Sequence, residues 1–140
     1  MRPVYLLDTG PLVAFVNRRD KHHEWARASL ASIAPPLLTC EGVISEACFL
    51  LQHAPGGPLR VLDLVGRGLI RIPYVLGDDA GPVAKLLERY SNVPMSLADA
   101  CLVRMTELLD DAAVMTVDAD FRIYRRSGRN LIPLIAPEHV

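Results

Sequence analysis

The chain is short of cysteine, and the few cysteines it has are not arranged as a framework. There are three, Cys40, Cys48 and Cys101, and no two of them form a Cys-x-x-Cys pair. Their odd number and their spacing do not suggest disulfide bonds. We expect them to be reduced and buried as small apolar side chains. We therefore expect a cytoplasmic protein.

An excess of positive charge is missing too. The 140 residues carry 15 lysine and arginine side chains against 16 aspartate and glutamate side chains, which gives a net charge of −1. The overall composition therefore does not indicate a nucleic-acid-binding protein, and any such binding must use a local patch of basic residues.

Long apolar runs are absent. No run approaches the length of about 18 residues that a transmembrane helix needs. The start of the chain has no long apolar segment followed by a cleavage site, so we expect neither a leader peptide nor a membrane anchor. Hydrophobic residues nevertheless make up 51% of the chain, which is enough to bury a core in a protein of this size. We expect a single domain over residues 1–140.

Short apolar segments alternate with longer segments of helical periodicity. The predicted strands are 4–7, 37–39, 69–72 and 112–116, with a weak edge strand that contains a proline at 131–134. The predicted helices are 9–16, 23–33, 41–52, 59–65, 78–90 and 96–109. This alternation is typical of an α/β layer fold with a parallel sheet.

Four acidic residues stand where an apolar run ends or a helix begins. Asp8 and Asp118 each follow a predicted strand. Asp99 lies in the first turn of a predicted helix, and Glu46 interrupts the apolar stripe of another. Ligands of parallel sheets bind beyond the carboxyl ends of the strands. We therefore expect the four carboxylates to converge at one edge of the sheet, with Glu46 pointing toward the core.

Such a cluster favours a divalent cation. Two carboxylates about 4 Å apart repel each other by roughly 4 kcal/mol at an effective dielectric constant near 20. Mg²⁺ or Mn²⁺ removes this repulsion and can orient a water molecule for attack on a phosphodiester. The pattern therefore predicts a Mg²⁺ (or Mn²⁺) cofactor.

Each acid also has a purely structural explanation. Asp8 can cap the helix that follows it, and Asp118 can be a turn residue. Asp99 matches a capping box with Ser96. Glu46 can belong to a buried ion pair or extend to solvent. The four acids together are therefore more informative than any one of them.

Three further side chains near these acids are candidates for supporting roles. Thr9 and Thr116 could hydrogen-bond a ligand carboxylate or a metal-bound water, although capping or strand propensity is the simpler explanation for each. Asp120 is a possible extra acid, and we expect it to face solvent.

Four segments, in this order, resemble the motifs of PIN-domain nucleases and, within that family, of the VapC-type toxins of bacterial and archaeal toxin–antitoxin pairs. They are Leu6–Ala14, Ser45–Leu51, Pro94–Ala100 and Met115–Arg122. Their order and spacing agree over essentially the whole chain. The one departure is Gly10, which stands where a serine is frequent and could weaken the support of the carboxylates.

The resemblance implies a three-layer α/β/α PIN-like fold with a mainly parallel sheet of about four or five strands. It also implies Mg²⁺- or Mn²⁺-dependent endonucleolytic cleavage of RNA. Asp8 and Asp99 would be the principal metal ligands, and Glu46 and Asp118 would complete the catalytic, metal-binding pocket. The implied partners are a second copy in a homodimer and a cognate antitoxin, whose arginine could enter the carboxylates.

Two basic clusters are candidates for RNA binding, with solvated loop charge as the alternative. Their members are Arg18, Arg19, Lys21, Arg122, Arg125 and Arg126. Tyr124, among the arginines of the second cluster, suits stacking on unpaired bases.

Three other functions remain open at this point. One is a housekeeping PIN nuclease without an antitoxin. Another is an α/β phosphatase or phospho-acceptor domain with Asp8 as the nucleophile. Such enzymes want a nearby second acid and a suitably placed lysine, but Gly10 and Pro11 follow closely and Lys21 and Lys85 are the only lysines. The third is a non-catalytic binding module whose acids are caps.

Overall fold

The main sheet of the computed structural model, which describes residues 3–140, has five strands, and every pairing in it is parallel. The strands are β1 (Val4–Leu7), β2 (Leu37–Leu38), β3 (Ile70–Arg71), β4 (Ala112–Met115) and β7 (Leu134–Ile135). Their order across the sheet is β3-β2-β1-β4-β7. The prediction of a mainly parallel sheet of four or five strands is confirmed.

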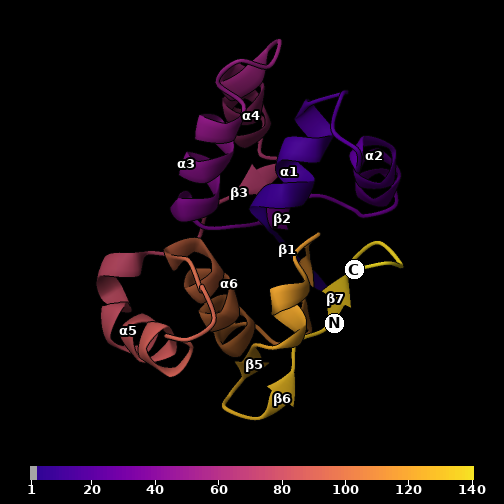
Figure 1. The fold of residues 1–140 in the computed structure, drawn as a ribbon. Helices are drawn as coiled ribbons and strands as arrows, with labels where there is room; N and C mark the ends of the chain where they lie inside the picture. The colour runs from indigo at the N-terminus through magenta and orange to yellow at the C-terminus, as the bar shows by residue number, and fades with distance from the viewer. Residues whose placement is uncertain (1–2) are drawn as a thin grey trace.

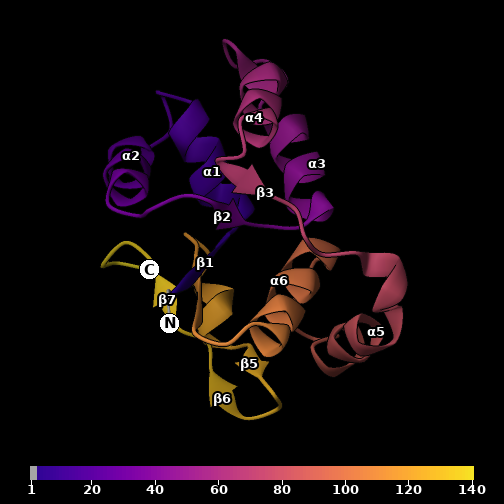
Figure 2. The ribbon, with the colours of Figure 1, turned by 180° about the vertical axis from the view of Figure 1, so that it is seen from behind.

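Helices cover both faces of this sheet. The six α-helices of the described residues are α1 (Thr9–Val16), α2 (His23–Ala31), α3 (Glu41–Leu50), α4 (Gly57–Gly66), α5 (Ala80–Arg89) and α6 (Leu97–Leu108). In both views α1 to α4 gather on one side of the sheet, and α5 and α6 lie on the other (Figures 1 and 2). The predicted three-layer α/β/α arrangement is therefore confirmed.

The strand order of the sheet reverses between β1 and β4. From β1 it runs through β2 to the edge strand β3, and β4 then pairs on the opposite side of β1. Leu7 lies opposite Met115, and the Asp8 amide donates to the Met115 carbonyl at 3.0 Å. Open α/β sheets bind ligands at such a reversal, beyond the carboxyl ends of the strands. Asp8 and Asp118 both follow the strands that flank it.

The last predicted strand, 131–134, is wrong as a single element. Its first residue belongs to β6 (Asn130–Leu131), which pairs with β5 (Arg125–Arg126) in a separate antiparallel hairpin. Its last residue begins β7, which is the edge strand that the proline predicted. Pro133 has no amide hydrogen to donate, but its carbonyl accepts from the Val114 amide at 2.9 Å. The chain therefore changes partner around the proline.

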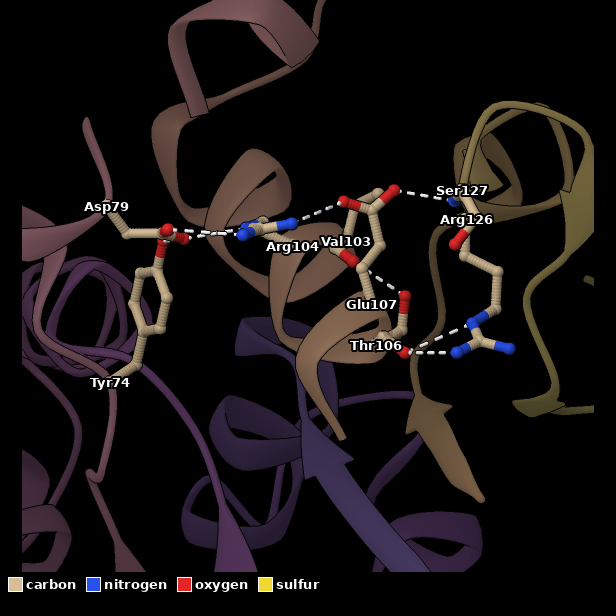
Figure 3. Close-up of polar contacts among 8 residues, drawn as sticks. All are labelled: Tyr74, Asp79, Val103, Arg104, Thr106, Glu107, Arg126 and Ser127. Carbon is tan, nitrogen blue, oxygen red and sulfur yellow. Dashed lines mark hydrogen bonds and ion pairs between the residues drawn. The ribbon is translucent and has the colours of Figure 1, made fainter. Parts of the chain in front are cut away.

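Helix α5 begins later than predicted because its acidic start has another partner. A 3-10 turn, η1 (Leu76–Asp78), comes first, and α5 starts at Ala80. The Asp79 carboxylate accepts from the Tyr74 hydroxyl at 2.6 Å and from Arg104 Nε at 2.8 Å. These bonds fix the start of α5 against the outer face of α6 (Figure 3).

The same face of α6 also holds the β5–β6 hairpin. Glu107 bonds to Arg104 at 3.3 Å and accepts from the Ser127 amide at 2.6 Å. The Arg126 guanidinium donates to the Thr106 carbonyl at 2.7 and 3.1 Å (Figure 3). Helix α6 is thereby bonded both to the start of α5 and to the β5–β6 hairpin.

The core lies against the two central strands. Leu6, Leu7, Val114 and Met115 of β1 and β4 are fully buried. None of the described helices combines the length and apolar character needed to cross a bilayer.

All three cysteines are free. Cys40 and Cys101 are buried as predicted. Cys48 on α3 is only half-buried, so its predicted burial is wrong.

Candidate functional site

Asp8 is held at the end of β1 by hydrogen bonds to both of its carboxylate oxygens. The side chain is only 5% exposed. Oδ2 accepts from the Thr116 hydroxyl at 2.7 Å, and Oδ1 accepts from the Thr9 amide at 2.8 Å. The bond to Thr116 joins residues at the ends of the two central strands.

Thr9 supplies a second polar atom at this position. Its Oγ1 is buried and has no hydrogen-bond partner among residues 3–140. An unpaired buried hydroxyl is costly, so a native structure normally gives it water or a ligand. The Thr9 hydroxyl is therefore an available donor beside Asp8.

Asp99 is both a capping residue and part of the site. It forms the predicted capping box of α6: the Asp99 amide donates to Ser96 Oγ at 3.0 Å, and the Ser96 amide donates to Asp99 Oδ2 at 3.4 Å. The same Oδ2 accepts from the Tyr124 hydroxyl at 3.0 Å. The capping explanation is correct, and it fixes the carboxylate in one orientation.

Asp118 and Asp120 belong to the turn that follows β4. The Asp118 amide donates to Thr116 Oγ1 at 2.9 Å, and its Oδ1 accepts from the Asp120 amide at 2.9 Å. Asp118 thus caps the 3-10 turn η2 (Ala119–Arg122). Asp120 is half-buried, and its role as an extra acid stays a prediction.

Glu46 is exposed, so the expectation that it points toward the core is wrong. On α3 only Val43 and Ala47 of the expected apolar stripe are buried, while Leu50 is 56% exposed. The buried face of α3 is therefore narrower than the sequence pattern indicates, and Glu46 lies beside it.

The four acids line one hollow. It has a volume of about 660 Å³. The residues around it are Asp8, Thr9, Gly10, Val13, Asp20, Lys21, His22, Glu46, Leu50, Asp99, Val117 and Asp118. Asp120 is not among them. Acids from β1, α3, α6 and the turn after β4 thus meet in one place.

The hollow disfavours negative charge on three of the carboxylates that line it, Asp8, Asp99 and Glu46. Burial, assisted by the charges of Asp99 and Asp118, raises the pKa of Asp8 to about 7, although the bonds from Thr116 and Thr9 act in the opposite direction. Burial also raises the pKa of Asp99 and of Glu46, with Asp118 contributing to both. A positive charge in the hollow would reverse these shifts.

The donors fit a hard divalent ion, although they do not form a complete cage. As the side chains stand, no three His, Cys, Asp or Glu residues within 3–140 are grouped closely enough to hold a metal ion. Mg²⁺ typically takes one or two carboxylates and completes its shell with water and substrate phosphate. The Asp8 carboxylate, with the unpartnered Thr9 hydroxyl beside it, offers the hard oxygen donors that such an ion requires.

The two predicted RNA-binding clusters lie in different surroundings. Lys21 lines the acidic hollow, and Arg18 and Arg19 are exposed beyond the end of α1. In the second cluster the arginines are largely engaged with backbone carbonyls. Arg125 Nη1 donates to the carbonyl of Tyr124 at 3.1 Å, and Arg122 Nε donates to that of Val140 at 2.9 Å.

Tyr124 contacts the site in a role other than the predicted one. It was expected to stack on RNA bases, but it is fully buried and donates to Asp99. The available signal was its spacing from Phe121, which brings the two rings into edge contact at 5.2 Å inside the core. His22, which lines the hollow and stacks on His139 at 5.4 Å, had no signal in the sequence.

A family model described as the PIN domain matches residues 5–127. The chain belongs to the PIN-domain family. The resemblance drawn from the four sequence motifs is therefore confirmed at the level of the family.

A solved structure shares this PIN fold. It is the crystal structure of Mycobacterium tuberculosis VapC20, described as a sarcin-ricin loop cleaving toxin. The TM-score is 0.71 at 22% sequence identity, over 83% of this chain and 91% of that chain. No curated protein gives a significant sequence match.

Proposed function

We propose that this PIN domain, taken as one unit over residues 1–140, is a Mg²⁺- or Mn²⁺-dependent endoribonuclease that hydrolyses RNA phosphodiester bonds. The observation that carries the proposal is the convergence of four carboxylates on one hollow at the reversal point of the sheet, in a member of a nuclease family.

In this proposal Asp8 and Asp99 hold the metal ion, and Glu46 and Asp118 complete the pocket directly or through water. The bound ion would stabilise charge on the phosphodiester and activate a water molecule. Thr116 orients Asp8, and the Thr9 hydroxyl is free to donate to water or substrate. Tyr124 orients Asp99.

The geometry gives less support to the phosphatase alternative. The second acid that such an enzyme wants shortly after its nucleophile is not there, because Gly10 and Pro11 occupy those positions. Lys21 is the one lysine among the residues around the hollow. Trapping a covalent phosphoaspartate at Asp8 would favour this alternative over the nuclease.

The catalytic test is RNA cleavage with and without divalent metal. We expect the wild type to cleave a mixed RNA with Mg²⁺ or Mn²⁺ and to lose activity with EDTA. Asp8→Asn and Asp99→Asn should each reduce the rate at least about 100-fold, because each removes a charge on which transition-state stabilisation depends. Cleavage that survives chelation, or survives both substitutions, would refute the mechanism.

We further propose that the protein is the toxin of a toxin–antitoxin pair, that it forms a homodimer, and that it acts on RNA in the cytoplasm. The fold shared with VapC20, whose description is that of an RNA-cleaving toxin, supports this role. A protein partner would find exposed apolar side chains on the adjacent helices α3 and α4: Phe49, Leu50, Leu59 and Leu62.

Induced expression in a bacterial host tests the toxin role. We expect growth arrest that is relieved by co-expression of the neighbouring reading frame, because the antitoxin would occlude the acidic hollow. Asp8→Asn should cause no arrest. RNA cleavage in vitro without arrest in the cell would favour a housekeeping nuclease.

A further inference from the structure

A second hollow lies beside the end of α1 and the start of α4. Its volume is about 380 Å³, and three of the six residues around it are arginines: Arg18, Arg19 and Arg60. Arg18 and Arg19 follow α1, whereas Arg60 comes from the first turns of α4, so folding brings them together from separate parts of the chain. The other three residues, Val16, Asn17 and Pro55, carry no charge.

The positive charge of this hollow is not balanced by the protein. None of the ion pairs formed within residues 3–140 involves Arg18, Arg19 or Arg60. Asp20, the acid next to Arg19, lines the acidic hollow and accepts from the His22 amide at 2.8 Å. Asp63, three residues after Arg60, pairs with Arg67 at 3.4 Å. All three arginine side chains are exposed. Three guanidinium groups without carboxylate partners form a site for an anion with several charges.

One loop joins this hollow to the acidic one. Arg18 and Arg19 line the arginine hollow, and the next three residues of the same loop, Asp20, Lys21 and His22, line the acidic hollow. A long polyanion could therefore place one phosphodiester group in the acidic hollow and extend over the loop to the arginine hollow. A single-stranded nucleic acid has this repeated charge along its whole length.

We propose that Arg18, Arg19 and Arg60 bind the phosphate backbone of the RNA strand beyond the bond that is cut. The proposal deepens the function proposed above and rests on it. Arg60, 39 residues beyond Lys21 in the sequence, extends the predicted cluster of Arg18, Arg19 and Lys21 onto a second helix. The three arginines would hold the strand without reading its sequence, because phosphate contacts carry no base information.

The test measures RNA binding separately from cleavage. A labelled single-stranded RNA of about 20 nucleotides is titrated with protein in EDTA at several salt concentrations. For single strands, the slope of log K against log salt changes by about 0.7 for each phosphate contact. We expect the R18A/R19A/R60A variant to lose about 2 from the slope, and at least 10-fold in affinity at low salt. Arg60→Ala alone should reduce the slope by about 0.7, and Arg60→Lys should keep most of the wild-type slope because it keeps the charge.

Arg71→Ala is the matched control. Arg71 is an exposed arginine on the edge strand β3 and lines neither hollow, so this variant removes one positive charge, as Arg60→Ala does, but from another place. It should leave the salt slope unchanged. A triple variant with the wild-type slope, or a loss equal to that of Arg71→Ala, would overturn the proposal. So would unchanged RNA binding together with loss of binding to polyglutamate, since that result assigns the arginines to an acidic protein segment.

Failure of this inference differs from failure of the proposed function. If the triple variant cleaves RNA with an unchanged KM while Asp8→Asn is inactive, the nuclease stands and the arginine site falls. If the wild type binds RNA through the arginines but cleaves none with any divalent metal, the site stands and the nuclease falls. Thermal unfolding of each variant verifies that the exposed substitutions leave the fold intact.

Discussion

Asp8 links the chemistry of the hollow to the stability of the metal-free protein. Its folded pKa of about 7 lies above the ordinary value of 3.8 because burial penalises the charged form. Between pH 3.8 and about pH 7, Asp8 is therefore protonated in the folded state and ionised in the unfolded state. The contribution of Asp8 to stability is fully present below pH 3.8 and is lost as pH rises through about 7.

We therefore predict that the metal-free protein becomes less stable as pH is raised from 5 to 8. The cost assigned to Asp8 is on the order of 4 kcal/mol at the upper end of this range. Asp8→Asn should be more stable than the wild type at pH 8 in EDTA and should show a shallower pH dependence, which thermal unfolding measures. Asp99 and Glu46 keep some dependence in the variant, because their pKa values are raised as well. Parallel curves for the two proteins would contradict the prediction.

Tyr124→Phe tests whether a buried hydroxyl positions a ligand carboxylate. The substitution keeps the ring that packs on Phe121 and removes the bond to Asp99, which holds the pKa of Asp99 down against the effect of burial. We expect a loss of about 1 kcal/mol in the free energy of unfolding, a higher pKa for Asp99, and a rate-against-pH profile displaced to higher pH. A lower rate with an unshifted profile would indicate a purely structural role.

The packing of α1 against the segment after β4 explains why residue 10 is glycine and not the serine that is frequent in the family. A Cβ at this position would overlap Cγ2 of Val117, in the segment that follows β4. Glycine therefore permits α1 to start close to that segment. The sequence analysis predicted weaker support of the carboxylates because the serine hydroxyl is missing. That prediction did not consider the contact with Val117.

We predict that Gly10→Ser destabilises the protein by about 1–3 kcal/mol through overpacking. Val117→Ala, which removes the obstructing methyl groups, should recover most of that loss in the double variant. A double-mutant cycle of unfolding free energies gives the coupling between the two positions. Additive effects would exclude the contact as the cause.

The elements could be predicted where a local pattern decides them. β1 and β4 are short apolar runs: β1 has the predicted bounds, and β4 ends at Met115, one residue before its predicted end. The β5–β6 hairpin could not be predicted, because Arg125–Arg126 and Asn130–Leu131 have no alternating pattern. Its position depends on bonds to the distant Thr106 and Glu107, which no local pattern encodes.

At the scale of the whole molecule, the gathering of Asp8, Asp99 and Asp118 followed from their places at strand and helix ends, whereas Glu46 lies in the middle of α3. The hydrogen bonds and neighbouring groups that orient each acidic side chain could not be predicted from the sequence. The direction of Glu46 depends on how much of α3 its neighbours cover, and the bond from Tyr124 to Asp99 joins side chains 25 residues apart. These are consequences of packing between layers, whereas the strand ends are local.

Metal binding should be visible as a change in the stability of the whole protein. A ligand present at about 100 times its dissociation constant stabilises the folded state by about 2.7 kcal/mol, which corresponds to about 5–10 °C in Tm for a protein of this size. We predict a rise of this order with Mn²⁺ or Mg²⁺ at pH 7.5. It should be much smaller in Asp8→Asn and Asp99→Asn, and Arg71→Ala should respond like the wild type. Equal shifts in all four proteins would place the ion elsewhere.

The pairing of β1 with β4 has a consequence for the time at which the protein can act. The bond between Asp8 and Thr116 spans 108 positions, so Asp8 leaves the ribosome long before the hydroxyl that orients it. A nascent chain that has not yet reached Asp118 has no complete hollow. The acidic hollow, and any activity that depends on it, can therefore form only after the ribosome has translated the segment that follows β4.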